Sequence, residues 1–476
     1  MLQHSLKFST IFLITSTVLL LGIGCGDKAT DPVPEVFSIS GTLSADGPLD
    51  FTTVTVNLYD APEDAQMKSL LSSYPFIGLV DADLMLFNPN SAVPFESVTP
   101  SASGEFQFTN LYQGDYIVDA AAAGFCCPQP ESISLGGNEN IGQMSLVTET
   151  EIIGNITTPT TFQSGHVYRI ASDINVIDVA PLTIQEGALI LVEGDYAIRI
   201  FSDIQVQGST TNPVRFRLHP DFYQPGADWE GIQIEAGAGD CSCTGMVMHG
   251  ISTGVETKSG NTQISECLFD APEAEAIIFS SLSSGTVEFC VIRDGDDGLV
   301  ATHTSPEFAN NLILRMSGAG INVQDSSQAN IHNNVIADCG VGIRSSWFTA
   351  PQIRYNLISG GDRAISAERG FDAQIEYNEL RGQTGEGIYF SIGYNYPAPF
   401  RYNNFIDQPQ HILFVNGSAG QQPDTVYAPY NYWDGESEED IPLRIIDGFD
   451  HGTLQNPIGP VDFLPILETP VSNAGP

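Results

Sequence analysis

The chain has 476 residues, of which 42% are hydrophobic, and it carries 17 Lys and Arg against 58 Asp and Glu, a formal net charge of −41. A surface this acidic repels nucleic acid phosphates and anionic lipid headgroups, which excludes nucleic acid as a partner and membrane binding by charge. The hydrophobic content is ample for packed cores, and the length predicts two or more domains.

Residues 1–24 have the features of an export signal. Lys7 precedes an apolar run from Phe8 to Ile23, which indicates a secretory signal peptide rather than a membrane span. The segment Leu21-Gly-Ile-Gly-Cys25 resembles a bacterial lipobox, although the usual Leu stands one place further from the Cys. The resemblance implies that Cys25 is the lipidated start of the mature chain; ordinary secretion is the alternative. Residues 25–36, small, polar and Pro-containing, are expected to form a tether.

Residues 37–148 have the alternation of a small β-sandwich, as in Val54, Val56 and Leu58. The segments that carry a family resemblance are Ser40-Gly-Thr-Leu, Val54-Thr-Val-Asn-Leu-Tyr, Ser103-Gly-Glu-Phe-Gln-Phe, Gly114-Asp-Tyr and Ala123-Gly-Phe. In this order they resemble the carboxypeptidase-regulatory-like (transthyretin-like) module, which implies a spacer or stabiliser and not a catalyst. An insertion from about 61 to 94 departs from the compact pattern and is expected to form a loop or a short helix.

Residues 149–465 contain a repeat, read as apolar, any, any, Asn or Cys, any, apolar. Its fourth positions lie between 21 and 25 residues apart and are Cys267, Cys290, Asn311, Asn334, Asn356, Asn378 and Asn403. A small residue and an aliphatic one, as in Gly298-Leu299, follow in each repeat. A fixed period near 22 residues with β-branched side chains predicts a solenoid of stacked β-coils.

In such a solenoid each strand pairs with its counterpart about 4.8 Å away. The apolar positions fill the interior, and the Asn is expected at a bend, in left-handed backbone, within a ladder of hydrogen-bonded amides. Cys at the first rungs is a small apolar substitute. The pattern resembles the right-handed parallel β-helix family, which includes polysaccharide lyases, epimerases and surface proteins. The expected fold is therefore all-β, a small β-sandwich followed by a right-handed parallel β-helix.

Both ends of the solenoid have weaker signals. Met246, His249 and Ile251 fit the repeat as an irregular early rung, with His249 as the bend residue. Asn431 and Trp433 stand at the ladder offsets and predict a last coil. Residues 466–476 are expected to be a disordered tail.

The acidic cluster Asp294, Asp296 and Asp297, near Arg293 and His303, is the best candidate for chemistry. Carboxylates on a turn suit Ca²⁺, so the three Asp are candidate ligands for this cofactor. Asp-Gly turns are nonetheless common without metal. The only lysine of the solenoid is Lys258, and the other motifs of known β-helix hydrolases and lyases are missing. No catalytic residue is therefore assigned.

Tyrosines provide candidate binding surfaces. Tyr355, Tyr377 and Tyr402 recur one coil apart, either inward as core or outward as a platform for sugar rings, and the period does not decide between the two. The preceding residues alternate in charge and predict a charge ladder; they are Arg354, Glu376 and Arg401. Candidate carbohydrate-binding residues on a longer insertion are Tyr389, Tyr394 and Tyr396.

Two functions are compatible with these features. The first is a monomeric, non-catalytic lipoprotein, held by its lipid on an outer membrane or cell surface, whose β-helix binds polysaccharide or another surface partner. The second is a polysaccharide lyase or epimerase that acts on uronate-containing glycans with Ca²⁺. Fold does not decide between them. The scarcity of lysine and the lack of a complete acid–base set favour the first.

Overall fold

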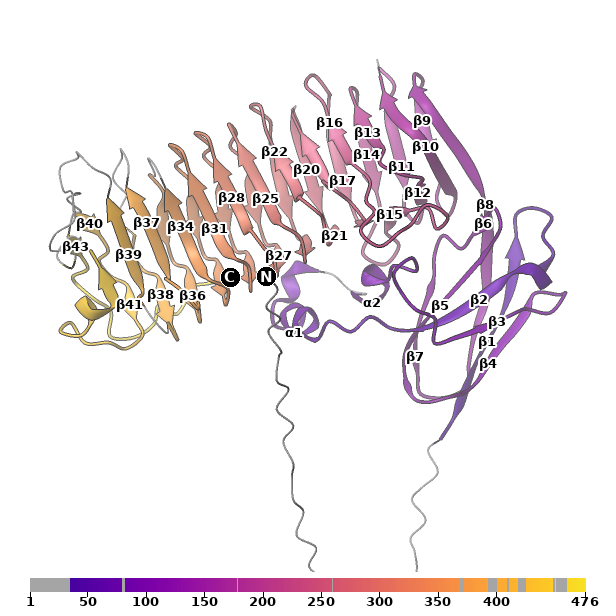
Figure 1. The fold of residues 1–476 in the computed structure, drawn as a ribbon, viewed down its shortest axis with the longest axis horizontal. Helices are drawn as coiled ribbons and strands as arrows, with labels where there is room; N and C mark the ends of the chain where they lie inside the picture. Colours follow the sequence, from indigo (N-terminus) through magenta and orange to yellow (C-terminus); the bar gives the residue numbers. More distant parts are fainter. Residues whose placement is uncertain are drawn as a thin grey trace, which may run out of the picture.

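A computed structural model describes residues 35–78, 82–177, 179–258, 260–368, 372–392, 400–408, 411–417, 425–447, 450 and 460–476. The chain is all-β, with a small strand domain followed by a long solenoid of parallel strands (Figure 1). The predicted fold class is therefore confirmed.

The N-terminal domain consists of two small sheets. In one sheet, β1 (Phe37–Ala45) lies between antiparallel β4 (Glu105–Leu111) and parallel β8 (Glu139–Ile156). In the other, β5 (Gly114–Ala122) pairs with β2 (Thr55–Asp60), β6 (Phe125–Cys126) and β7 (Glu131–Leu135), and β2 also pairs with β3 (Glu96–Val98). The short 3₁₀ turn η1 is Phe51–Thr53. The inward positions of the alternating strands, such as Val56 and Phe108, are fully buried in one core.

The two domains share the strand β8. Its first part, residues 139–146, pairs with β1, and its last part, residues 149–156, pairs with β10 (Val167–Val176) of the solenoid. The boundary that the sequence predicts after residue 148 therefore falls inside a continuous strand, with no loop at the junction.

Three parallel sheets form the solenoid, and most coils contribute one strand to each sheet; in the first coil, β10 pairs with strands of both the second and the third sheet. The first sheet consists of β9 (Thr160–Phe162), β11 (Leu182–Gln185), β14 (Ile204–Gln207), β17 (Cys241–Thr244), β20 (Asn261–Ser265), β23 (Ser284–Glu288), β26 (Glu307–Ala309), β29 (Asn330–His332), β32 (Gln352–Arg354) and β35 (Gln374–Glu376). The second sheet consists of β12 (Leu189–Val192), β15 (Val214–Leu218), β18 (Met246–His249), β21 (Leu268–Asp270), β24 (Val291–Arg293), β27 (Leu312–Leu314), β30 (Val335–Ala337), β33 (Leu357–Ser359), β36 (Glu379–Arg381), β38 (Asn404–Ile406) and β41 (Tyr432–Trp433).

The third sheet consists of β13 (Ala197–Ile200), β16 (Gly231–Ile234), β19 (Val255–Thr257), β22 (Glu275–Phe279), β25 (Asp297–Thr302), β28 (Ala319–Gln324), β31 (Val341–Ser346), β34 (Arg363–Glu368), β37 (Ile388–Ile392), β39 (Leu413–Gly417) and β42 (Ile445–Ile446). At the C-terminal end lie η3 (Ile441–Arg444) and the pair β40 (Val426–Tyr427) and β43 (Val461–Asp462).

The small residue at the second position of a strand in the third sheet, such as Gly298 in β25, faces the backbone of the next coil. A Cβ atom at Gly298 would lie 2.3 Å from the carbonyl oxygen of Gly320, and one at Gly320 would lie 2.8 Å from that of Gly342. Because the coils stack this closely, a side chain at these positions would force them apart. This contact explains the recurring small-then-aliphatic pair in the sequence.

The Asn residues of the repeat stack in one fully buried column. Asn311 Nδ2 donates to Asn334 Oδ1 at 3.0 Å, and the same contact continues from coil to coil as far as Asn431. Earlier in the column, the backbone N–H of Cys290 donates to Asn311 Oδ1 at 3.0 Å. The expected left-handed backbone at the Asn is wrong: it belongs to the residue before, for example Tyr355 with φ of 55°. The Asn instead points inward and binds the carbonyl groups of the bend.

The predicted rung around His249 is also wrong. Strand β18 pairs with β21 so that Val247 lies opposite Leu268, which places Met246 rather than His249 beside Cys267. His249 is opposite Asp270, and its Nδ1 lies 2.9 Å from Asp270 Oδ2. The misreading arose because Met246 and Met248 are both apolar, so the repeat fits the sequence in either register.

The insertion in the N-terminal domain forms the short helices α1 (Ala65–Ser73), η2 (Pro75–Ile77) and α2 (Ala82–Leu86). Asp64 begins α1 by accepting the backbone N–H of Met67. Met67, Ile77, Met85 and Leu86 then pack against the outer side of the second sheet. Their partners are Val247, Leu268, Val291, Leu312, Leu314, Val335, Ala337 and Leu357. These strands are therefore buried on both sides.

The C-terminal residues are ordered, which contradicts the expected disordered tail at 466–476. The backbone N–H of Leu467 donates to the carbonyl of Asn431 at 3.0 Å, and that of Gly475 donates to the carbonyl of Tyr377 at 2.9 Å. Between them, the side chain of Asn404 exchanges two hydrogen bonds with the backbone of Val471. The side chain of Asn404 thus makes the hydrogen bonds to Val471 that the backbone of a neighbouring strand would otherwise make.

The outer side of the second sheet is consequently covered by three separate segments, and we call it the covered face. Cys126 and Val147 of the N-terminal domain pack against its first strands, α1 to α2 against its middle, and the C-terminal residues against its end. In Figure 1 the helices lie directly below the middle of the solenoid.

Candidate functional site

The predicted Ca²⁺ ligands do not converge on a common point. Asp294 pairs with Arg315 Nε at 2.6 Å, Asp296 accepts from Ser317 Oγ at 2.8 Å, and Asp297 accepts from Asn322 Nδ2 at 2.7 Å. Across the part of the chain that the structure describes, no three His, Cys, Asp or Glu side chains form a group that could hold a metal. Each carboxylate therefore has a structural partner of its own.

Arg293 was the expected charge-neutralising group beside these acids. Its side chain instead pairs with acids of both the N-terminal insertion and the solenoid. Its Nη1 lies 2.6 Å from Asp64 Oδ2 and its Nε lies 2.7 Å from Asp270 Oδ1. Arg315 Nη2 also lies 2.6 Å from Asp64 Oδ2. Burial works against the Asp64 carboxylate, but hydrogen bonds from Arg315 and Met67 and the two arginine charges together lower its pKa. We call Asp64, Arg293 and Arg315 the clasp.

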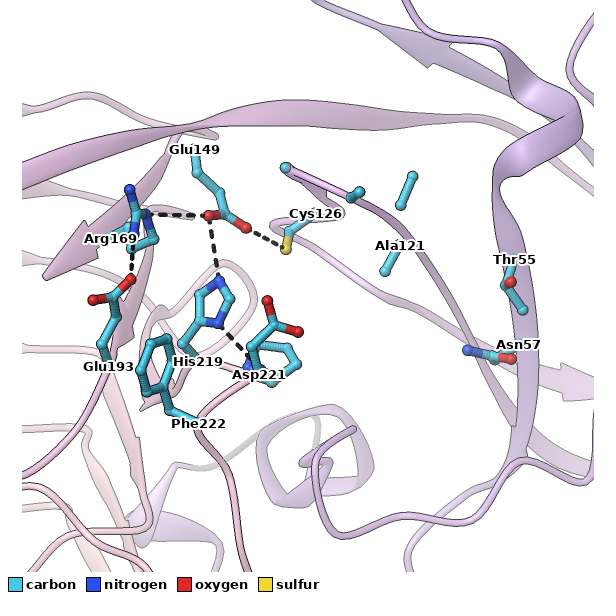
Figure 2. A pocket seen from close by; sticks show the side chains of 14 residues that line it. Thr55, Asn57, Ala121, Cys126, Glu149, Arg169, Glu193, His219, Asp221 and Phe222 are labelled. Carbon is cyan, nitrogen blue, oxygen red and sulfur yellow. Dashed lines mark hydrogen bonds and ion pairs between the residues drawn. The ribbon is translucent and has the colours of Figure 1, made fainter. Parts of the chain in front are cut away.

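A cleft of about 970 Å³ lies between the N-terminal domain and the first coils (Figure 2). Thr55 and Asn57 of β2 line one wall. On the other wall, Glu149 Oε2 lies 3.3 Å from His219 Nε2 and 3.5 Å from Arg169 Nε. Arg169 also pairs with Glu151 and Glu193. Figure 2 shows Glu149 between His219, Arg169 and Cys126.

Cys126 and Glu149 are poorly suited to act as nucleophile and base. Burial raises the pKa of Cys126 to about 12, so its side chain is a thiol at neutral pH rather than a thiolate. The hydrogen bond from His219 lowers the pKa of Glu149, which makes this carboxylate a weaker base. The cleft is therefore best described as a polar seam between two domains.

A smaller groove of about 320 Å³ lies on the third sheet and is strongly acidic. Its carboxylates are Asp195, Asp228, Glu230, Glu256 and Glu273. Burial, followed by the hydrogen bond with Glu273, raises the pKa of Asp228 to about 6. Lys258, the only lysine of the solenoid, pairs with Glu256 at 3.2 Å and Glu235 at 3.6 Å. The acidic side chains of the groove still outnumber their basic partners, so a uronate chain would meet a predominantly negative surface here.

The tyrosine column lies outside the core, which contradicts the inward alternative. Tyr355, Tyr377, Tyr402 and Tyr430 have ring centroids 5.1, 5.1 and 5.6 Å apart, with planes within 16° of parallel. Near-parallel rings this close overlap face to face. The faces of Tyr377 and Tyr402 are therefore covered on both sides, and the column presents edges and hydroxyl groups. A flat platform for sugar rings is not formed either.

The charge ladder beside this column is present. Glu376 lies 3.6 Å from Arg354 Nε and 2.8 Å from Arg401 Nε. On the third sheet, Arg363 lies over the ring of Tyr389, 4.4 Å from its centroid, and pairs with Glu386 at 2.7 Å. Tyr389 is thus half-buried with one ring face in contact with a cation. The other candidates, which are Tyr394, Tyr396 and the predicted lipidation residue Cys25, lie outside the described residues.

Residues 230–360 match the family model of the right-handed β-helix region. The matched stretch lies wholly within the solenoid and includes the column from Cys267 to Asn356. Together with the parallel sheets, it identifies the solenoid as a right-handed β-helix. No match was found among curated proteins or among solved structures.

The sequence reasoning overlooked the outward positions of the first sheet. Strands β11, β14, β17 and β20 read Leu-Thr-Ile-Gln, Ile-Gln-Val-Gln, Cys-Ser-Cys-Thr and Asn-Thr-Gln-Ile-Ser. Their outward residues carry amides or hydroxyl groups and no charge. The alternation of Gln, Thr and Ser with apolar residues was the signal that could have found this face. No helix in the described parts of the chain is long and apolar enough to span a membrane.

Proposed function

We propose that this protein is an exported, lipid-anchored surface protein whose β-helix binds polysaccharide without cleaving it. The observation that carries the non-catalytic part is the clasp. The arginine of the best acidic cluster is committed to Asp64 and Asp270, and the three Asp of that cluster have separate structural partners. Catalysis on such a surface needs a proton acceptor beside a free charge-neutralising group.

The binding part is supported by the shape of the solenoid. The second sheet is covered by the chain itself, whereas the first and third sheets have outward polar side chains exposed to solvent. Regularly spaced side chains on a rigid surface suit a repeating polymer better than a single small molecule. A protein partner on the same surface is the alternative occupant.

The anchor is tested by Cys25→Ala in the full chain. Removing residues 1–24 takes away Lys7 and no acid, so the side-chain charge changes from −41 to −42. Such a chain gains no membrane affinity from charge, and acyl chains must supply it. The variant should leave the membrane fraction. A variant that stays membrane-bound in high salt would show that the anchor lies elsewhere.

Catalysis is tested by incubating the full chain with uronate polymers and Ca²⁺ and following the absorbance of unsaturated products. We expect no product, and we expect Asp296→Ala with Asp297→Ala to leave glycan retention nearly unchanged. Calcium-dependent double-bond formation that this double substitution abolishes would establish the alternative function, a polysaccharide lyase or epimerase.

A further inference from the structure

Four consecutive coils of the first sheet present an outward face without charge. In register, Thr183 lies beside Gln205, Gln205 beside Ser242 and Ser242 beside Gln263. A second outward column two residues further along the strands consists of Gln185, Gln207, Thr244 and Ser265. We call these eight residues the amide face. Gln205, Gln207 and Gln263 are exposed and the other five are partly exposed.

The same coils are charged on the third sheet. Its outward positions there include Arg199, Glu235, Glu256 and Lys258, and the acidic groove lies beside them. An uncharged face is unexpected on a protein with 17 basic and 58 acidic residues. The surrounding negative potential repels polyanions from the whole solenoid. A ligand of the amide face is therefore not an anionic polymer.

The chemistry of the amide face suits hydroxyl groups. A Gln side chain offers two donors and an acceptor, and a Ser or Thr hydroxyl both donates and accepts. The contacts within the face, Gln207 Nε2 to Gln205 Oε1 at 3.2 Å and Thr244 Oγ1 to Ser265 Oγ at 3.2 Å, use only part of this capacity. Sugar hydroxyl groups could take the rest without the cost of desolvating a charge.

The geometry favours an extended chain. Equivalent side chains recur at the coil spacing of about 4.8 Å, which is comparable with the length of one sugar unit in an extended glycan. The face is an open, regular surface, so a short sugar would make few contacts on it, whereas a polymer would repeat the same contact at every coil.

We infer that the outward face of β11, β14, β17 and β20 binds an uncharged polysaccharide that lies along the solenoid axis. This inference rests on the proposed binding function and specifies its ligand class and its position. Because no charged group takes part, binding should change little between low and physiological salt.

The experiment measures retention of the full chain on a panel of polymers: β-1,4-glucan, β-1,3-glucan and xylan as neutral glycans, polygalacturonate as the anionic one and chitosan as the cationic one. We expect retention on at least one neutral glycan and little on polygalacturonate. Gln205→Ala with Gln263→Ala should weaken that retention roughly tenfold, because two hydrogen-bonding groups are lost. The matched control is Gln233→Ala with Gln324→Ala on the third sheet, which should bind as the unsubstituted chain does.

If the Ala variant does not fold, Gln205→Glu with Gln263→Glu keeps the side-chain size and should show at least the same loss. Retention on polygalacturonate or chitosan alone would overturn the ligand class while leaving polysaccharide binding in place. Neutral-glycan retention that survives both amide-face variants, or that is lost in Tyr394→Ala with Tyr396→Ala, would overturn the position. Retention on no polymer would overturn the proposed function itself.

Discussion

The first and second sheets of the solenoid share the same coils and the same core, yet their outer sides differ completely. On β24, β27 and β30 the outward residues are Val291, Leu312, Leu314, Val335 and Ala337, all buried beneath the N-terminal insertion. On β14, β17 and β20 they are Gln, Ser, Thr and one Asn, all in contact with solvent. The inward residues stabilise the coil in both sheets. The outward residues are apolar where the chain covers the sheet and polar where the sheet meets solvent.

The covered face stabilises the arrangement of the two domains. Leu268 and Leu312 have at most 1% of their surface exposed. Burying a leucine side chain contributes about 1.5–3 kcal/mol. A handful of such residues outweighs the ion pairs of the clasp, whose role is to set where α1 docks along the sheet.

The largest effect is expected from a charge on the covered face. Leu312→Lys would place an unpaired ammonium group under α1 and should lower the free energy of unfolding by about 3–5 kcal/mol. The matched substitution on the first sheet, Thr286→Lys, lies beside Glu307 at a partly exposed position and should have little effect. Urea unfolding measures both. Equal losses would mean that the two sheets do not differ in burial as described.

A substitution in the Asn column should damage both sheets at once, because the column lies at the corner between them. Asn334→Ala removes the acceptor of the Asn311 backbone N–H and the donor to the Phe308 carbonyl. Buried groups left without partners cost about 1–3 kcal/mol each, so we expect a loss of about 3 kcal/mol in urea unfolding. Asn330→Ala, at an outward and partly exposed position of β29, is the control. A loss no larger than that of the control would show that the column adds little stability.

Asp64→Asn should weaken the covered face by about 1–2 kcal/mol at neutral pH. Asn still caps α1, but it loses the charge between Arg293 and Arg315. Since the folded pKa of Asp64 is lowered, its contribution is present above the ordinary Asp pKa and is lost as pH falls through the folded value. The difference between variant and parent should therefore disappear in acid. Asp50→Asn, at an exposed cap far from the clasp, loses no arginine partner and should have a smaller effect than Asp64→Asn.

The smallest expected effect is an increase in the free energy of unfolding rather than a decrease. Burial raises the pKa of Asp119 to about 6, against the opposing charges of Arg217 and Arg215. A raised carboxyl pKa means that the folded state loses stability as pH rises from about 4 to about 6. Asp119→Asn should remove this loss and stabilise the protein by about 1 kcal/mol at pH 7, with no gain at pH 4. Destabilisation at pH 7 would show that the ionised carboxylate is needed by the arginines.

Much of the solenoid was predictable because its register is periodic. Each step between consecutive fourth positions, from Cys267 to Asn403, is one coil, and the buried columns follow from this spacing. The covered face was not predicted, although Leu312-Ile-Leu314 lacks the alternation of a strand with one wet side, which is a sign of burial on both sides. The clasp joins residues 229 positions apart in the chain, and no local pattern marks such a pair.

The candidate sites were less predictable than the fold. The acids from Asp294 to Asp297 were found by composition, but composition does not tell a metal ligand from a partner of Arg315 or Ser317. The orientation of Tyr355, Tyr377 and Tyr402 was undetermined because these residues occupy left-handed corners rather than strand positions. The period-two rule for inward and outward side chains does not apply at a corner.

The shared strand β8 has a mechanical consequence. Consider a pulling force applied between the start of β1 at Phe37 and the solenoid, which the C-terminal part of β8 joins. This force acts in opposite directions along the two parallel strands β1 and β8. The hydrogen bonds between β1 and β8 are then loaded together in shear rather than broken one after another. A tension that reaches the β-helix from residues before Phe37 would thus be resisted by the whole strand pair, and the solenoid would keep its alignment with β8 under load.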